Sequence, residues 1–191
     1  MCTESSDQTG DGGVGSIVPV LLRCTSRLLA TLGAKTKPAL ASADPSGDDW
    51  YANLFWLDGR KCLLVTHAGT LFSIFTPDVR AVELRPIGHF VIPAVKDALR
   101  SEGLSVDTFG HLDADEVTIA KTANRSVLGC MNDLAFHCEM AVSQSGGIGR
   151  LDVAGVNRRL HRTILGPLGR DLPIELAVAA QWPRAGGSGA G

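Results

Sequence analysis

The chain has 191 residues, of which 45 % are hydrophobic and 20 % are charged, and its formal net charge at pH 7 is -2. This length fits one globular domain, and the near-neutral charge excludes a global electrostatic attraction to nucleic acid or to an anionic membrane. No apolar run approaches the roughly 20 residues of a membrane helix, and the N-terminus lacks the pattern of a signal peptide. The five cysteines form no CxxC pair, which argues against a disulfide framework or a zinc knuckle and favours a reduced, cytoplasmic protein.

The two ends of the chain differ in composition from the middle. Residues 1–16 are rich in glycine and contain no aromatic residue, which predicts a disordered extension, because such a segment buries too little apolar surface. Residues 183–191 have the composition of a flexible tail. A single globular domain is therefore expected over residues 17–182, with a surface loop at residues 34–49.

The first elements expected in this domain are a strand and a short helix. Residues 17–23 are rich in β-branched side chains and predict a strand. A helix is expected to follow, capped by Thr25 or Ser26, ending at Leu32 and leaving Gly33 at its C′ position.

The clearest local pattern is a β-hairpin. Two apolar runs, residues 50–57 and 60–66, are separated by Asp58-Gly59, which predicts a type I′ turn and places Leu57 opposite Arg60. The hairpin face that begins with Trp50 is the more apolar and is expected to pack on the core, whereas the other face mixes polar and apolar groups. Residues 70–76 predict a third antiparallel strand that ends at Pro77.

The second half of the chain predicts mainly helices. Residues 86–104 suit a helix, but Pro93 in its interior implies that it either starts near Ile92 or kinks. Residues 117–121 predict a strand, and residues 126–142 carry apolar side chains at helical spacing. A further helix is expected after Asp152, with Val156, Leu160 and Ile164 inward, followed by a short apolar element at residues 174–180. The predicted fold class is α+β, with a small antiparallel sheet formed by residues 50–76 and packed with several helices.

The segment from Asn124 to Asp133 holds more polar groups than packing requires. On the predicted helix, Arg125, Asn132 and Asp133 lie on the face opposite the apolar stripe, and Gly129 leaves room for an approaching group. An arginine holds a carboxylate or phosphate with two hydrogen bonds, and an aspartate can serve as a base. Arg125 and Asp133 are therefore the candidate catalytic pair.

A ligand site built on this segment would include polar side chains of the hairpin. The candidate ligand-binding residues are Asn53, Arg60, Thr66, Arg125, Asn132 and Asp133. A purely structural role is the alternative, in which Asn124, Arg125 and Ser126 only cap the helix and Asp133 pairs with a sheet arginine such as Arg60.

A second candidate surface is basic. Residues 150–170 hold five arginines against the single acid Asp152, and Arg158, Arg159, His161 and Arg162 are expected on the outer arc of a short helix. Such a face can bind the phosphates of a nucleic acid even on a neutral protein, although it lacks aromatic residues for base stacking. A solvated helix surface is the alternative.

Other chemistries have weaker support. Cysteines are usually buried and inert. Cys130 is the best candidate for a nucleophile among the five, because it lies one residue off the apolar stripe and could be partly exposed. The five histidines are dispersed, so neither a metal site nor a cofactor is expected. The glycines of residues 146–149 lack the lysine and the preceding strand of a phosphate-binding loop and suit a linker between helices.

Several of these segments together resemble a bacterial family of uncharacterised proteins, domain of unknown function 6933. The resemblance is carried by residues 23–25, 50–54, 60–66, 70–73, 77–80 and 124–133, and it extends from about Leu22 to Leu165. The chain departs from the family at Cys130, where a serine is expected, at Asp58-Gly59, where an arginine is expected, and in its long ends. The resemblance implies a cytoplasmic bacterial domain and no particular reaction.

The sequence therefore predicts a binding module for an anionic ligand or a macromolecular partner. The alternative is a small hydrolase or transferase that acts on a phosphate-containing or nucleic-acid substrate. No membrane contact is expected in either case.

Overall fold

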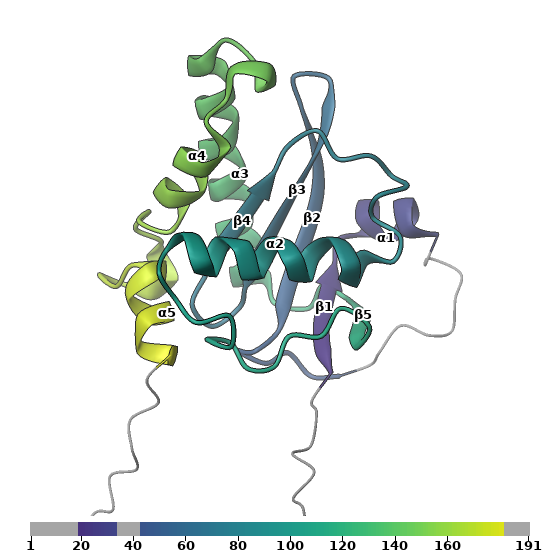
Figure 1. Ribbon diagram of the computed structural model, residues 1–191, viewed down its shortest axis with the longest axis vertical. Helices are drawn as coiled ribbons and strands as arrows, with labels where there is room; N and C mark the ends of the chain where they lie inside the picture. The colour runs from purple at the N-terminus through teal and green to yellow at the C-terminus, as the bar shows by residue number, and fades with distance from the viewer. Residues whose placement is uncertain (1–18, 34–42, 182–191) are drawn as a thin grey trace, which may run out of the picture.

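A computed structural model describes residues 19–33 and 43–181 of the chain. The expectations for residues 1–16 and 183–191 therefore lie outside the described residues. The described part contains a five-stranded sheet in the order β4-β3-β2-β1-β5. Helices cover both faces of this sheet, as Figure 1 shows.

The centre of the sheet is the hairpin of β2 (Trp50–Leu57) and β3 (Arg60–His67). Asp58 and Gly59 both have positive φ, at 49° and 72°, as a type I′ turn requires, and Leu57 pairs with Arg60. The predicted register is therefore confirmed. The antiparallel strand β4 (Ser73–Thr76) begins later than residue 70, because Leu71 adopts a left-handed conformation with φ 54° and turns the chain.

The sheet is mixed rather than antiparallel, which corrects the predicted fold class. Strand β1 (Val20–Cys24) pairs in parallel with β2 on one side and with β5 (Val117–Lys121) on the other. Helix α1 (Ser26–Leu32) lies between β1 and β2 in the chain, and a connection that contains a helix allows the two strands to be parallel. The strands themselves were predicted, but their pairing depends on contacts between distant segments.

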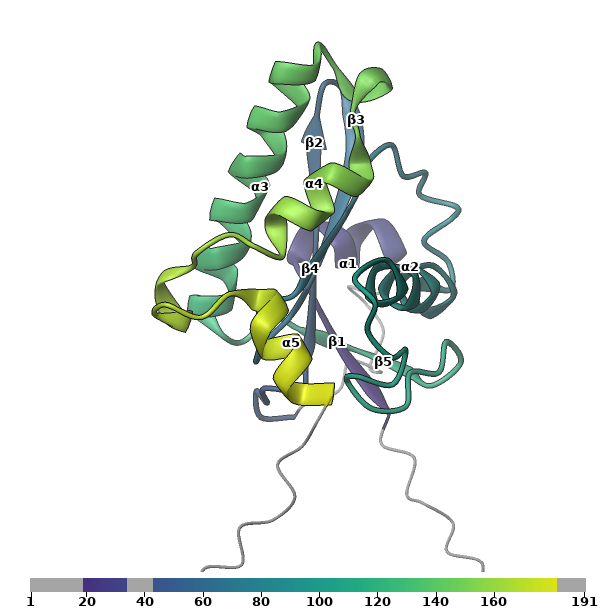
Figure 2. The ribbon, with the colours of Figure 1, turned by 60° about the vertical axis from the view of Figure 1, so that its left-hand side comes forward.

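The helices form two layers around the sheet. Figure 2 shows α2 (Ile87–Ser101) and α3 (Arg125–Ser145) on opposite sides of it. One core joins α2 and α1 to the hairpin face that begins with Trp50, as predicted. The other hairpin face is equally buried, because the apolar stripe of α3 and helix α4 (Val153–Leu160) cover it. That face was predicted to be partly polar, and its central residues Cys62 and Leu64 are fully buried.

The helix expected within residues 86–104 is α2, which starts at Ile87 and continues through Pro93, so a start near Ile92, one of the two alternatives, is excluded. The predicted extent of the helix after Asp152 needs correction. Helix α4 ends at Leu160, so Ile164 lies beyond the helical face and is 69 % exposed instead of inward. Short 3-10 turns at Ile148–Arg150 and Gly166–Leu168 flank α4, and α5 (Pro173–Gln181) closes the described chain. None of the helices in the described ranges is long and apolar enough to cross a membrane.

Candidate functional site

Helix α3 begins at the polar segment that the sequence singled out. The Asn124 side chain accepts hydrogen bonds from the backbone N–H groups of Ser126 and Val127, at 2.9 and 3.3 Å. The Asn124 N–H donates to the hydroxyl of the buried Tyr51 at 3.2 Å, which ties the start of the helix to β2. Asn124 therefore acts as a cap, and its role is structural.

The remaining polar residues of this segment project from the opposite side of the helix. Arg125, Asn132 and Asp133 are exposed, and their side chains make no hydrogen bond or ion pair with any described residue. A Cβ atom added at Gly129 would meet nothing within 4 Å, so the space above the glycine is open. Contacts within the described residues do not explain why Arg125, Gly129, Asn132 and Asp133 occupy these four positions.

The hairpin members of the predicted site lie elsewhere. Asn53 accepts a hydrogen bond from the Thr25 hydroxyl at 3.2 Å, and the buried Thr66 shares a hydrogen bond of 2.9 Å with Ser73. Arg60 forms an ion pair with Asp78, not with Asp133. The structure therefore does not bring the six predicted residues together, because α3 turns its apolar stripe to the sheet and its polar side chains away from it.

Two large apolar side chains share the outer surface of α3 with these polar groups. Phe136 is 59 % exposed and Met140 is 42 % exposed. They are four residues apart, and Asn132 lies a further four residues before Phe136, so the three form one row along the helix. Sequence reasoning left Phe136 and Met140 out of the site. The available signal was that both fall outside the apolar stripe of an otherwise amphipathic helix.

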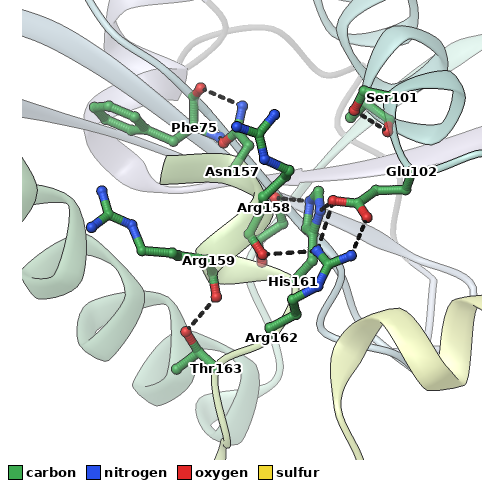
Figure 3. A network of polar contacts seen from close by, with 11 residues as sticks. Phe75, Ser101, Glu102, Asn157, Arg158, Arg159, His161, Arg162 and Thr163 are labelled. Carbon is green, nitrogen blue, oxygen red and sulfur yellow. Dashed lines mark hydrogen bonds and ion pairs between the residues drawn. The ribbon is translucent and has the colours of Figure 1, made fainter. Parts of the chain in front are cut away.

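Helix α4 carries a polar network rather than a simple basic face (Figure 3). The Glu102 carboxylate accepts two hydrogen bonds from Arg162, at 2.9 and 2.6 Å, and lies 2.9 Å from His161 Nδ1. His161 Nε2 lies 2.9 Å from the backbone carbonyl of Ser73, and this nitrogen donates because a carbonyl can only accept. The network joins the end of α2 and the end of α4 to strand β4.

This network changes the interpretation of the predicted basic patch. His161 was expected on the outer arc but is fully buried, because the chain turns at the end of α4 and its ring stacks on Phe72 at 3.9 Å. Arg162 is held by Glu102, and Figure 3 shows Arg159 extending away from that carboxylate. The three arginines proposed for nucleic acid therefore do not form one free cationic surface.

Asn157 of α4 binds the backbone of the edge strand β4. Its side chain accepts a hydrogen bond from the Phe75 N–H at 2.8 Å and donates to the Phe75 carbonyl at 3.2 Å. A strand at the edge of a sheet leaves backbone N–H and C=O groups without partners, and Asn157 pairs with both of these groups of Phe75 on β4. The structural roles of Asn157 and Glu102 were not predicted from the sequence, because nothing in their local sequence distinguishes them from polar residues on the surface.

Protonation in the network follows from burial and hydrogen bonding. Burial lowers the pKa of the His161 imidazole, against the opposing effect of its hydrogen bonds to Glu102 and Ser73. Burial acts to raise the pKa of the Glu102 carboxyl, but the hydrogen bonds from Arg162 and His161 outweigh it and leave that pKa below its ordinary value. With a ring that no solvent reaches, the pair holds elements together and is not placed to act on a substrate.

A second buried polar cluster fixes the loop before β2. Arg23 Nε lies 2.5 Å from Asp49 Oδ2, and both side chains are almost completely buried. The same guanidinium donates to the backbone carbonyls of Ala43 and Asp44, at 2.8 and 2.9 Å. Every polar contact of Arg23 points to the protein itself, so its role is also structural.

The described cysteines are all free and buried. Burial raises the pKa of the Cys24 and Cys138 thiols to about 12 and also raises that of Cys130. Cys130 is the least buried of the four described cysteines, but at 4 % exposed it is still buried, which corrects the expectation that it is partly exposed. Its position one residue off the stripe still faces the second core. These thiols are therefore protonated and poorly suited to nucleophilic attack.

His67 is the most perturbed histidine. Its ring stacks on Phe109 at 4.2 Å and meets the edge of Trp50, and Nδ1 lies 3.1 Å from the Thr70 hydroxyl. Burial lowers the pKa of His67 to about 4, although Asp48 and Asp49 act in the opposite direction. The ring is therefore neutral in the folded protein at neutral pH.

This shift predicts how stability depends on pH. Because the unfolded chain takes up a proton near pH 6.5 and the folded protein only near pH 4, stability falls as the pH is lowered through this window. The contribution of His67 to this loss is about 3 kcal/mol at pH 4. Urea unfolding of the native protein and of His67→Gln at pH 7 and pH 4 measures it: the variant is expected to lose about 3 kcal/mol less on acidification. Parallel losses in both proteins would contradict the assignment.

Two surface clefts lie elsewhere on the described part of the molecule. One, of about 390 Å³, lies between α2 and residues 111–114, and the other, of about 360 Å³, lies between the hairpin turn and the end of α3. Neither is lined by any of the six predicted ligand-binding residues. Within residues 19–33 and 43–181, no three histidine, cysteine or acidic side chains are grouped to hold a metal ion.

These features define an α+β domain with a mixed sheet between helical layers, buried polar networks that hold it together, and free polar and apolar side chains on the outer face of α3. The chain belongs to the family described as domain of unknown function 6933 (DUF6933), whose model matches residues 21–176. Comparison with curated proteins gives no match.

Proposed function

We propose that this domain is a binding module for a protein partner, and that the partner docks on the outer face of α3. The observation that carries the proposal is the exposure of Phe136 and Met140 beside polar residues that have no partner among the described residues. Large exposed apolar side chains that lie together are characteristic of interaction surfaces. This docking face consists of Arg125, Gly129, Asn132, Asp133, Phe136 and Met140.

The chemistry of the docking face defines what it would bind. Burial of a side chain such as Phe136 or Met140 contributes about 1.5–3 kcal/mol. A row of anchors four residues apart suits an apolar groove on the partner, in the manner of other helix-in-groove complexes. Arg125 is free to hold a carboxylate of the partner with two hydrogen bonds. Such a carboxylate would be the anionic ligand that the sequence predicts.

The position of Asp133 does not favour catalysis. Asp133 is exposed to solvent on the outer surface of a helix, whereas a general base works in a pocket that orients its substrate. The proposal includes the cytoplasmic location expected from the sequence, which the four free, buried cysteines support, because such thiols are typical of a reducing compartment.

Site-specific photocrosslinking in the native host cell tests the docking face. A photoreactive amino acid replaces Phe136, and a matched control replaces Val82, which is 72 % exposed but lies outside the docking face. We expect a discrete crosslinked partner from position 136 and not from position 82. Arg125→Glu in the same chain is expected to reduce that product at least about fivefold, since it reverses a charge in the contact.

The outcome that contradicts the proposal is equally specific. Identical products from positions 136 and 82, or a product from position 136 that is unchanged by Arg125→Glu and by Met140→Ser, would show that the docking face is an ordinary solvated surface. The free energy of unfolding of each variant, measured with urea, serves as the control for folding.

A further inference from the structure

The docking face on α3 contains both a projecting side chain and a gap. Phe136 is 59 % exposed, and seven residues before it lies Gly129, where an added Cβ atom would meet nothing within 4 Å. Residues seven apart in a helix lie on nearly the same side of it, two turns from each other. One side of α3 therefore carries an exposed aromatic ring and, two turns away, a position that has no side chain.

Two opposite charges are placed in a similar way. Arg125 is exposed at the start of α3, and Glu139 is exposed fourteen residues later, directly before Met140. Neither side chain forms an ion pair with another of the described residues. Because a helix rises by about 1.5 Å per residue, the two charges lie about 21 Å apart along it and do not pair with each other. Both are therefore free to pair with groups of another molecule.

The two pairs of features have almost the same midpoint on the helix. The midpoint of Gly129 and Phe136 lies just after Asn132, and the midpoint of Arg125 and Glu139 is Asn132 itself. A two-fold axis at this point relates two antiparallel copies of the helix, and residues equally far from the axis on its two sides become neighbours across the contact. The Phe136 ring of one copy then faces Gly129 of the other. Arg125 of one copy likewise faces Glu139 of the other.

We propose that the partner of the docking face is a second copy of this chain, bound through antiparallel α3 helices with a two-fold axis at Asn132. This inference rests on the proposed docking face and identifies its occupant. The Phe136 ring of each copy enters the gap above Gly129 of the other, as a knob enters a hole between packed helices. Arg125 of each copy holds the Glu139 carboxylate of the other through charge-assisted hydrogen bonds. Each copy therefore completes the contact surface of the other.

The remaining residues of the docking face are compatible with this contact. Met140 of one copy lies beside the aliphatic part of Arg125 of the other, which covers its exposed surface. Asn132 of each copy lies opposite Asp133 of the other and donates to its carboxylate, which offsets the repulsion between the two Asp133 side chains near the axis. A contact between two single helices is smaller than the roughly 1,200–2,000 Å² of stable interfaces, so the dimer is expected to be weak.

Sedimentation equilibrium of the purified full chain tests the proposal. We expect a monomer–dimer equilibrium that shifts to the monomer on dilution. Arg125→Glu and Glu139→Arg each place like charges at both ends of the contact, and each is expected to weaken self-association at least about tenfold. An equimolar mixture of the two single variants restores opposite charges at both ends, and it is expected to form a heterodimer at least as tight as the native dimer.

Filling the gap at Gly129 tests the contact with the Phe136 ring. Glutamine is a good helix former, and a Cβ atom at this position meets nothing, so Gly129→Gln is not expected to lower the free energy of unfolding. It is expected to weaken the dimer at least about fivefold, because its side chain occupies the space that Phe136 of the other copy enters. His137→Gln changes an exposed residue of the same helix outside the docking face, and it is expected to leave the dimer unchanged.

Photocrosslinking of the purified chain from position 136 tests the antiparallel arrangement, with one copy isotopically labelled so that the two can be told apart. The expected crosslink joins position 136 to the region of Gly129 in the other copy. A crosslink between the two positions 136, or a mixture of the two charge variants that associates no better than either alone, would overturn the proposal. A purified chain that stays monomeric at millimolar concentration but crosslinks to a different protein in the host cell would also overturn it, and would leave the docking face itself supported.

Discussion

Replacement of Asp49 by alanine is expected to lower the free energy of unfolding by about 3–5 kcal/mol. The substitution leaves the Arg23 guanidinium buried without the carboxylate that lies 2.5 Å from its Nε atom. It also removes the acceptor for the Ser46 N–H, so the turn at residues 46–49 loses a hydrogen bond. Urea unfolding followed by circular dichroism measures the change.

The double variant Arg23→Met, Asp49→Leu is the control for this prediction. An apolar pair of similar volume removes both charges from the interior, and such replacements often restore most of the stability. We expect the double variant to be more stable than Asp49→Ala. A loss below about 1 kcal/mol in Asp49→Ala would contradict the account, because an exposed ion pair has that value.

Replacement of Glu102 by alanine is expected to cost about 3 kcal/mol. Its carboxylate is 3 % exposed and holds both the buried His161 ring and the Arg162 guanidinium, so its loss leaves two polar groups without a partner. The ends of α2 and α4 are expected to separate first, since Glu102 bonds the end of α2 to His161 and Arg162 at the end of α4. Hydrogen exchange of the α4 amides, together with urea unfolding, measures both effects.

Two further variants show whether the charge or the hydrogen bonds matter at Glu102. Glu102→Gln keeps the size of the side chain and one acceptor oxygen but removes the charge, and it is expected to retain about half of the lost stability. Asp97→Ala breaks an exposed ion pair with Arg100 on the same helix and is expected to cost about 0.5 kcal/mol or less. Equal losses in Glu102→Ala and Asp97→Ala would contradict a special role of the network.

Local features of the sequence predicted the local structure well. Asp58-Gly59 fixed the hairpin register, because a two-residue turn with positive φ allows one pairing. The apolar stripe of residues 127–142 predicted α3, which extends only a few residues further at each end. Of Asn124, Arg125 and Ser126, which were considered as its cap, the Asn124 side chain caps the helix.

Features that depend on contacts between distant segments were not predictable in the same way. The parallel pairing of β1 with β2 and β5 joins residues up to 97 positions apart in the register, such as Val20 and Val117. Burial of His161 depends on where α4 ends and on Glu102, which lies 59 positions earlier in the chain. Periodicity placed this histidine among exposed arginines, because it assumes that the helix continues.

The candidate site shows the same limit. The sequence identified Arg125, Asn132 and Asp133 as residues that packing does not require, and the structure places all three on an exposed face. It grouped them with Asn53, Arg60 and Thr66 because the hairpin was assumed to expose one polar face. In the structure α3 covers that face, and each hairpin residue bonds to a nearer neighbour.

The buried polar residues maintain the fold, and we propose that the exposed polar residues of α3 bind a partner. The triple variant Arg125→Ala, Asn132→Ala, Asp133→Ala tests it most directly when its stability and its crosslinking from position 136 are measured together. We expect a free energy of unfolding within about 0.5 kcal/mol of the native protein and loss of the crosslinked partner. A large loss of stability, or an unchanged crosslink in a folded protein, would contradict it.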